Sequence, residues 1–108
     1  MGREHDLIIR GGQNIFPAGV EAVLSQHPKI VEVAVVGIPD AEMGERVCAF
    51  VVCGEGKPVD LIEIKSFLEA KGLARFKWPE RIEIVKSLPR VASGYKIDKK
   101  KLKEDFLP

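Results

Sequence analysis

The sequence predicts a small α/β sandwich, an α+β arrangement in which a hairpin precedes a central three-stranded sheet flanked by about three helices. Two long β-branched runs, 30–38 and 46–53, indicate neighbouring strands because only a short link separates them. Apolar residues at helical spacing before and after these runs indicate helices that pack on the sheet. At 108 residues, the chain is expected to form one domain.

The first part of this fold is predicted to be a hairpin followed by a helix. Short apolar runs, 7–9 and 14–16, flank Gly11-Gly12, a pattern typical of a tight hairpin turn. Pro17 favours a helix start, because the first helical residue does not need a backbone N–H. The helix is expected to end at the next proline, and its apolar face comprises Val20, Val23, Leu24 and His27, the last as a helix-end residue.

The two central strands are predicted to be buried on much of both faces. Their β-branched composition is continuous rather than alternating, which is typical of strands covered on both sides. A loop that begins at Pro39-Asp40 and runs through Gly44 is expected to join them.

The second half is predicted to begin with an amphipathic helix. Asp60 and Glu63 have the spacing of a capping box, and Gly72 fits the opposite end. Apolar residues alternate over 80–86, so a third, half-exposed strand is expected there. The residues of this strand that would face inward are Ile82 and Ile84.

The composition argues against several classes of function. The chain is 45% hydrophobic and 31% charged with a net charge of +1, so it has no general attraction to nucleic acid or membranes. No apolar run reaches the length of a membrane-spanning helix. Cys48 and Cys53 would lie about 16 Å apart in an extended strand, too far for a disulfide. They are interpreted as free, buried thiols of a reducing compartment, and neither histidine is near them in sequence, which argues against a metal site.

The segment 88–102 has features suited to delivering one positive charge to a site elsewhere. Pro89 cannot donate to a strand ladder, and the small residues at 92–94 favour a turn. Asp98 is expected to cap a final helix. Lys96 therefore lies in a loop that is held at both ends. The hydrophobic staple expected at the helix start comprises Ile97 and Leu102.

This segment resembles the C-terminal signature of the adenylate-forming acyl-CoA synthetase superfamily, the AMP-dependent synthetases and ligases. That signature is Leu-Pro-Arg, a Thr-like residue, two variable residues, Gly-Lys, an aliphatic residue and a basic helix start. Two departures are present, because Val91 replaces the usual Thr and Tyr95 separates the Gly from the Lys. The matching positions are Leu88, Pro89, Arg90, Gly94, Lys96 and Ile97.

Further segments resemble motifs of the same superfamily, in the family's order. Residues 2–17, continued by Val20-Glu21, are similar to its hinge-and-hairpin motif, and 33–40 with 44–47 resemble its V-G-x-P-D and G-E-x-V stretches. The resemblance implies that residues 1–108 are the C-terminal mobile domain of an AMP-forming acyl-CoA ligase, with the large N-terminal domain absent.

The resemblance also implies roles for individual residues. Lys96 would be the catalytic lysine of adenylation, a fixed positive charge that contacts both the carboxylate and the α-phosphate. Arg3 would bind the nucleotide near its phosphate and ribose, Gly94 would be a further cofactor-binding residue, and Gly12 would let the pantetheine arm of CoA pass close to the backbone. His5 would be the hinge residue about which the domain rotates.

The implied enzyme is an acid–thiol ligase that uses ATP, with Mg²⁺ bound mostly by the N-terminal domain, and CoA as co-substrate. The acid and ATP would give an acyl-adenylate and pyrophosphate. The domain would then rotate, and the thiol of CoA would displace AMP to form the thioester. The isolated domain is expected to fold but to be inactive, and the enzyme to be cytoplasmic with no nucleic-acid partner and no membrane span.

Two alternatives remain open at this point. The first is the same domain of a peptide-synthetase adenylation enzyme, in which a carrier protein replaces CoA. The second is a free-standing module that binds nucleic acid, which is disfavoured because the strands offer only Phe50 as an aromatic residue. The residues do not identify the carboxylic acid, because its pocket would belong to the N-terminal domain.

Overall fold

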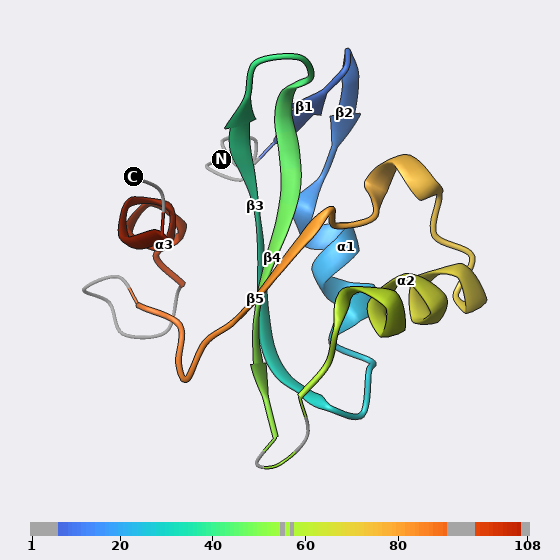
Figure 1. The fold of residues 1–108 in the computed structure, drawn as a ribbon, viewed down its shortest axis with the longest axis vertical. Helices are drawn as coiled ribbons and strands as arrows, with labels where there is room; N and C mark the ends of the chain where they lie inside the picture. The colour runs from blue at the N-terminus through green and yellow to red at the C-terminus, as the bar shows by residue number, and fades with distance from the viewer. Residues whose placement is uncertain (1–6, 55, 57, 91–96, 107–108) are drawn as a thin grey trace.

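The computed structural model describes residues 7–54, 56, 58–90 and 97–106. A five-stranded sheet forms the centre, with α1 and α2 on one face and α3 on the other (Figure 1). The predicted α+β class is confirmed. The described helices include none that is long and apolar enough to cross a membrane.

The opening hairpin consists of β1 (Ile8–Arg10) and β2 (Gln13–Ile15), paired antiparallel. Gly11 and Gly12 have φ values of +57° and +84°, and positive φ at both positions is what a type I′ hairpin turn requires. The predicted hairpin is confirmed. It also joins the main sheet, because β1 pairs with the next hairpin through Arg10 and Gly44. The sheet therefore has five strands rather than the expected central three.

The central strands are β3 (Ile30–Asp40) and β4 (Gly44–Cys53), which pair antiparallel, and β5 (Arg81–Ile84) lies parallel to β4. The expected loop from Pro39 is wrong, because Pro39 and Asp40 remain in register with Glu45 and Gly44. Proline is tolerated there because β3 ends the strand order and is an edge strand.

The sheet separates two apolar clusters, because successive side chains of a strand point to opposite faces. The larger cluster lies against α1 (Pro17–Leu24) and α2 (Leu61–Ala70), and the smaller one against α3 (Lys99–Phe106). Val35 belongs to the first and its neighbours Ala34 and Val36 to the second. The central strands are thus buried on both faces, as predicted. The smaller cluster comprises Ala34, Val36, Cys48, Phe50, Leu88 and Leu102.

The first helix ends at Leu24, so the prediction that His27 is a helix-end residue is wrong. The His27 side chain is buried, and its Nδ1 accepts a hydrogen bond of 3.1 Å from the Lys29 N–H. Its Nε2 lies 3.4 Å from the Glu63 carboxylate, and its ring packs edge-on against Phe67. His27 therefore joins the segment after α1 to α2, a contact that only the tertiary fold creates.

Both predicted ends of α2 are confirmed. The Asp60 carboxylate accepts the Glu63 N–H at 2.8 Å, although the Glu63 side chain turns to His27 and Lys29 instead of back to the cap. Gly72 has φ +80° after the helix, and the Leu73 N–H donates to the Leu68 carbonyl, which is the Schellman pattern.

Ile82 and Ile84 of the third strand were both predicted to face inward. The prediction is confirmed for Ile82 and wrong for Ile84. After the short 3₁₀ turn η2 (Arg75–Lys77), β5 places Ile82 against the larger cluster. Ile84, however, is 49% exposed. The strand ends there, and Val85 packs with the smaller cluster on the opposite face.

The two cysteines are free. Cys48 is buried and Cys53 only partly so, and burial raises the pKa of the Cys48 thiol to about 11. A thiol that resists ionisation is a poor nucleophile, so Cys48 is a core residue rather than a reactive one.

Candidate functional site

The structure describes one of the predicted site residues, Gly12. Lys96, Gly94, Arg3 and His5 lie outside the described residues, so their roles stay predictions. The site is therefore built from its described neighbours: the hairpin turn around Gly12, and the two ends of the loop that carries Lys96.

The hairpin turn presents open backbone at Gly12. A Cβ built at Gly12 would meet no atom within 4 Å, whereas one built at Gly11 would lie 2.7 Å from Cε of Met43. The Gly11 N–H also donates to the Met43 carbonyl at 2.8 Å. One glycine of the turn is thus packed against the β3–β4 loop, and the other is accessible to a ligand.

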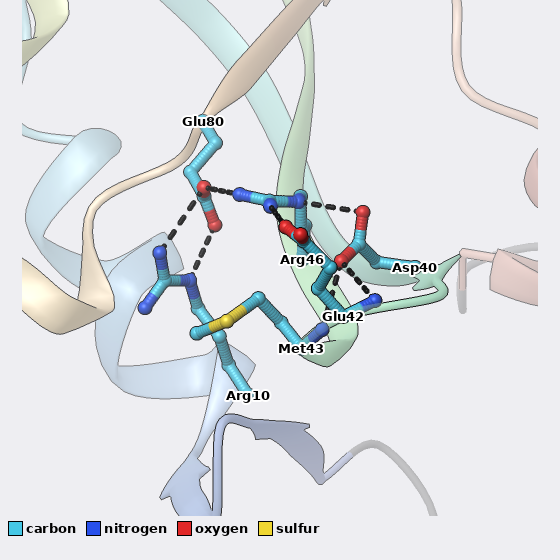
Figure 2. Close-up of polar contacts among 6 residues, drawn as sticks. All are labelled: Arg10, Asp40, Glu42, Met43, Arg46 and Glu80. Atoms are coloured by element: carbon cyan, nitrogen blue, oxygen red, sulfur yellow. Dashed lines mark hydrogen bonds and ion pairs between the residues drawn. The ribbon is translucent and has the colours of Figure 1, made fainter.

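A network of ion pairs holds the base of this turn, and Figure 2 shows Glu80 between two guanidinium groups. The Glu80 carboxylate accepts from Arg10 Nε at 2.5 Å and from Arg46 Nη1 at 2.5 Å. Arg46 also reaches Oδ1 of Asp40 through its Nε at 2.7 Å. These four residues, named here the Glu80 network, come from β1, β3, β4 and the residue before β5.

The network lowers the pKa of both carboxylates. The hydrogen bond from Arg10 is the largest cause for Glu80 and outweighs its partial desolvation, and Arg46 adds to it. For Asp40, the hydrogen bond from Arg46 is the largest cause, followed by the N–H of Met43. Both groups are therefore held ionised.

We expect acid to weaken the fold partly through this network. A carboxyl whose pKa is lowered on folding contributes stability above its ordinary pKa and loses it as the pH falls. The free energy of unfolding should thus decline below about pH 4.5, the ordinary value for Glu80. The decline should be smaller in Glu80→Gln. Urea titrations from pH 7 to pH 3 measure this, with the exposed Glu69→Gln as the control. Parallel pH profiles of the native protein and Glu80→Gln would contradict it.

The ends of the lysine loop are held together, as predicted. Arg90 and Ile97 form an isolated antiparallel bridge, and the Asp98 N–H donates to the Pro89 carbonyl at 2.8 Å. Asp98 also caps α3, since its carboxylate accepts the Lys101 N–H at 3.0 Å. The expected staple residues, Ile97 and Leu102, both join the smaller apolar cluster.

Two glutamates fix these ends to the body of the domain. Arg90 donates to Oε2 of Glu32 on β3 at 2.6 Å. Glu21 on α1 contacts Lys99, the first residue of α3, at 2.7 Å and also accepts the Val35 N–H at 2.7 Å. The residues on both sides of 91–96, the segment that contains Lys96, are therefore anchored, one side to the sheet and the other to α1.

The turn and Arg90, which directly precedes 91–96, are attached at opposite ends of β3, whereas Lys99, after that segment, is attached through Glu21 at Val35 in the middle of the strand. The turn is attached at Asp40, which pairs with Gly44 beside Arg10, and Arg90 is anchored at Glu32. The eight residues from Glu32 to Asp40 span about 26 Å at the usual rise of a strand. Within the described residues, the turn and Arg90 are therefore attached well apart along β3.

Sequence reasoning missed the Glu80 network. Arg10, Asp40 and Arg46 lie in motifs that were singled out, but Glu80 does not, and it is 70 positions from Arg10 in the chain. Among the described residues, no group of three or more His, Cys, Asp or Glu could hold a metal ion.

Comparison with known proteins gives consistent matches. Residues 19–95 match the family described as the AMP-binding enzyme C-terminal domain. The chain is 48% identical over 103 residues to a mitochondrial medium-chain acyl-CoA ligase of Danio rerio, covering 95% of this chain and 17% of that protein. It is 43% identical over 107 residues to the medium-chain fatty-acid–CoA ligase of Escherichia coli, covering 98% and 19%.

Solved structures match equally well. Apo MatB from Rhodopseudomonas palustris has a TM-score of 0.88 at 39% identity, covering 97% of this chain and 20% of that one. Apo MbtA from Mycobacterium smegmatis has a TM-score of 0.87 at 40% identity, covering 92% and 18%. The chain thus spans about a fifth of the length of the proteins it matches.

Proposed function

Because the chain belongs to the AMP-binding enzyme C-terminal domain family, as its motifs predicted, we propose that it acts in an ATP-dependent, AMP-forming carboxylate–CoA ligase. In this proposal residues 1–108 are the C-terminal domain, and a large N-terminal domain supplies the acid pocket and most contacts to ATP and Mg²⁺. CoA is favoured as the thiol because similar proteins, both among the curated relatives and among the solved structures, are named CoA ligases or CoA synthetases. The free thiols support a reducing compartment, and we propose the cytoplasm.

In the first half-reaction, Lys96 supplies the positive charge. A carboxylate oxygen attacks the α-phosphate of ATP, so two anions approach and negative charge accumulates in the transition state. A preorganised ammonium group that touches both lowers this barrier electrostatically. Arg3 and Gly94 contact the nucleotide in the same state.

In the second half-reaction, the hairpin turn replaces the lysine loop at the reaction centre. The open backbone at Gly12 leaves room for the pantetheine arm, and the thiol attacks the acyl carbon while AMP leaves. Rotation about His5 exchanges the two surfaces. The observation that most supports this proposal is that the turn is attached at Asp40 and Arg90 at Glu32, toward opposite ends of β3, which suits a domain that presents one of the two at a time.

A domain exchange tests the proposal. Residues 1–108 would replace the matching segment of the Escherichia coli medium-chain fatty-acid–CoA ligase. We expect the chimera to exchange pyrophosphate into ATP with a medium-chain acid and to form the CoA thioester, while the truncated ligase and the isolated chain do neither. A folded chimera that lacks both activities would contradict the proposal. Adenylate formation by the isolated chain would contradict it as well.

A further inference from the structure

We infer that Glu80 positions the hairpin turn for thioester formation, an inference that rests on the proposed function. Glu80 contacts Arg10, the residue directly before Gly11-Gly12, and Arg46 on β4 (Figure 2). Glu80 thus links the base of the turn to β4, the strand that pairs with β1, β3 and β5.

The backbone attachment of the turn is short. Within the described residues, the ladder between β1 and β4 consists of one pair, Arg10 with Gly44. It is supplemented by the hydrogen bond from Gly11 to Met43 and by the Ile9 N–H, which donates to Oε1 of Glu45 at 2.8 Å. A two-stranded hairpin with so little pairing depends on side-chain contacts for a fixed orientation.

Glu80 itself is firmly held. Its N–H donates to the Val47 carbonyl of β4 at 2.8 Å, and the preceding Pro79 is among the fully buried residues. The Arg10 and Glu80 side chains are only 24% and 26% exposed, so their charge-assisted hydrogen bond is partly shielded from water. Glu80 therefore ties Arg10 to β4, in addition to the core contacts of the buried Ile8 and Ile15.

Replacing Glu80 with glutamine keeps the size of the side chain and removes its charge. Arg10 would then lose its ionic partner, and the turn would be less well fixed beside the incoming thiol. Small misplacements of a positioning group are costly, so we expect kcat/KM for CoA to fall about tenfold. Adenylation should be spared, because the residues that flank 91–96 are anchored by Glu32 and Glu21 and not by Glu80.

The test uses the full-length protein that carries this domain. Thioester formation is measured from a presynthesised acyl-adenylate over a range of CoA concentrations, and adenylation by pyrophosphate exchange. Glu80→Gln should lower the first about tenfold and leave the second within about twofold. Glu83→Gln is the matched control, because its side chain is equally exposed at 26% and pairs with Arg81 at 2.5 Å, away from the turn.

A second measurement reads the position of the turn without activity. Hydrogen exchange of the peptide that covers 7–16 should be faster in Glu80→Gln than in Glu83→Gln or the unmodified protein. Unchanged exchange, or an unchanged CoA dependence in an active enzyme, would overturn the inference. An unmodified protein that forms no thioester would instead overturn the proposed function, and the exchange data would still decide whether Glu80 holds the turn.

Discussion

Replacing Lys96 with alanine in the full-length enzyme is expected to abolish adenylate formation while thioester formation from a presynthesised acyl-adenylate survives. Removing a preorganised charge from a transition state of this kind costs on the order of a hundred- to a thousandfold in rate. The second half-reaction should be spared because the lysine loop has left the reaction centre by then. Pyrophosphate exchange measures the first step, and release of CoA thioester measures the second.

Lys100→Ala is the matched control for Lys96→Ala. Lys100 is exposed in the same basic run, on α3, so its replacement removes the same charge from the same region. It should leave both half-reactions unchanged. If both half-reactions survive in Lys96→Ala, then either another lysine of the run acts in its place or the enzyme does not use this loop for adenylation.

Replacing Gly12 with leucine should have the opposite effect, slowing thioester formation and sparing adenylation. The space beside the Gly12 backbone is open in this structure, and a leucine side chain would occupy it. Obstructing the path of the pantetheine arm should lower the rate with CoA by at least about tenfold, since the thiol must approach within near-contact distance of the acyl carbon. The same two half-reaction assays give the answer.

Backbone strain needs its own control, because leucine is disfavoured at a φ of +84°. Gly72 has φ +80° and equally open surroundings at the end of α2, so Gly72→Leu introduces similar strain away from the turn. Its half-reactions should match those of the unmodified enzyme. Equal losses in Gly12→Leu and Gly72→Leu would show that strain, rather than obstruction of CoA, is responsible.

The parts of the fold that sequence reasoning predicted are those with local signals. Gly11-Gly12 determines a hairpin turn, Asp60 and Asp98 cap helices, and Gly72 ends one, because each acts on backbone groups within a few residues. The errors arise where distant contacts decide. Pro39 stays in a strand because that strand is at the edge of the sheet.

His27 shows the same limit. Its spacing from Val20 and Leu24 is helical, yet the helix ends before it, and the ring is buried against Phe67 and Glu63 from another helix. No periodicity within one segment contains that information, because the contact depends on how two helices pack.

The residues of the candidate site also fall into two groups, those predicted from local motifs and those that only distant contacts bring together. Gly12 was predicted from a motif whose residues are adjacent in the chain; its backbone is open, and its role stays a prediction. The Glu80 network was not predicted. Its charges look like ordinary surface residues until the register of β1, β4 and β5 brings Arg10, Arg46 and Glu80 together.

The central claim is that two ends of one domain serve two successive half-reactions. The most direct measurement is a parallel assay of both half-reactions in Lys96→Ala and Gly12→Leu of the full-length enzyme. We expect a crossed pattern, in which the first variant loses adenylation alone and the second loses thioester formation alone. Loss of the same half-reaction in both variants, or equal loss of both half-reactions in either one, would contradict it.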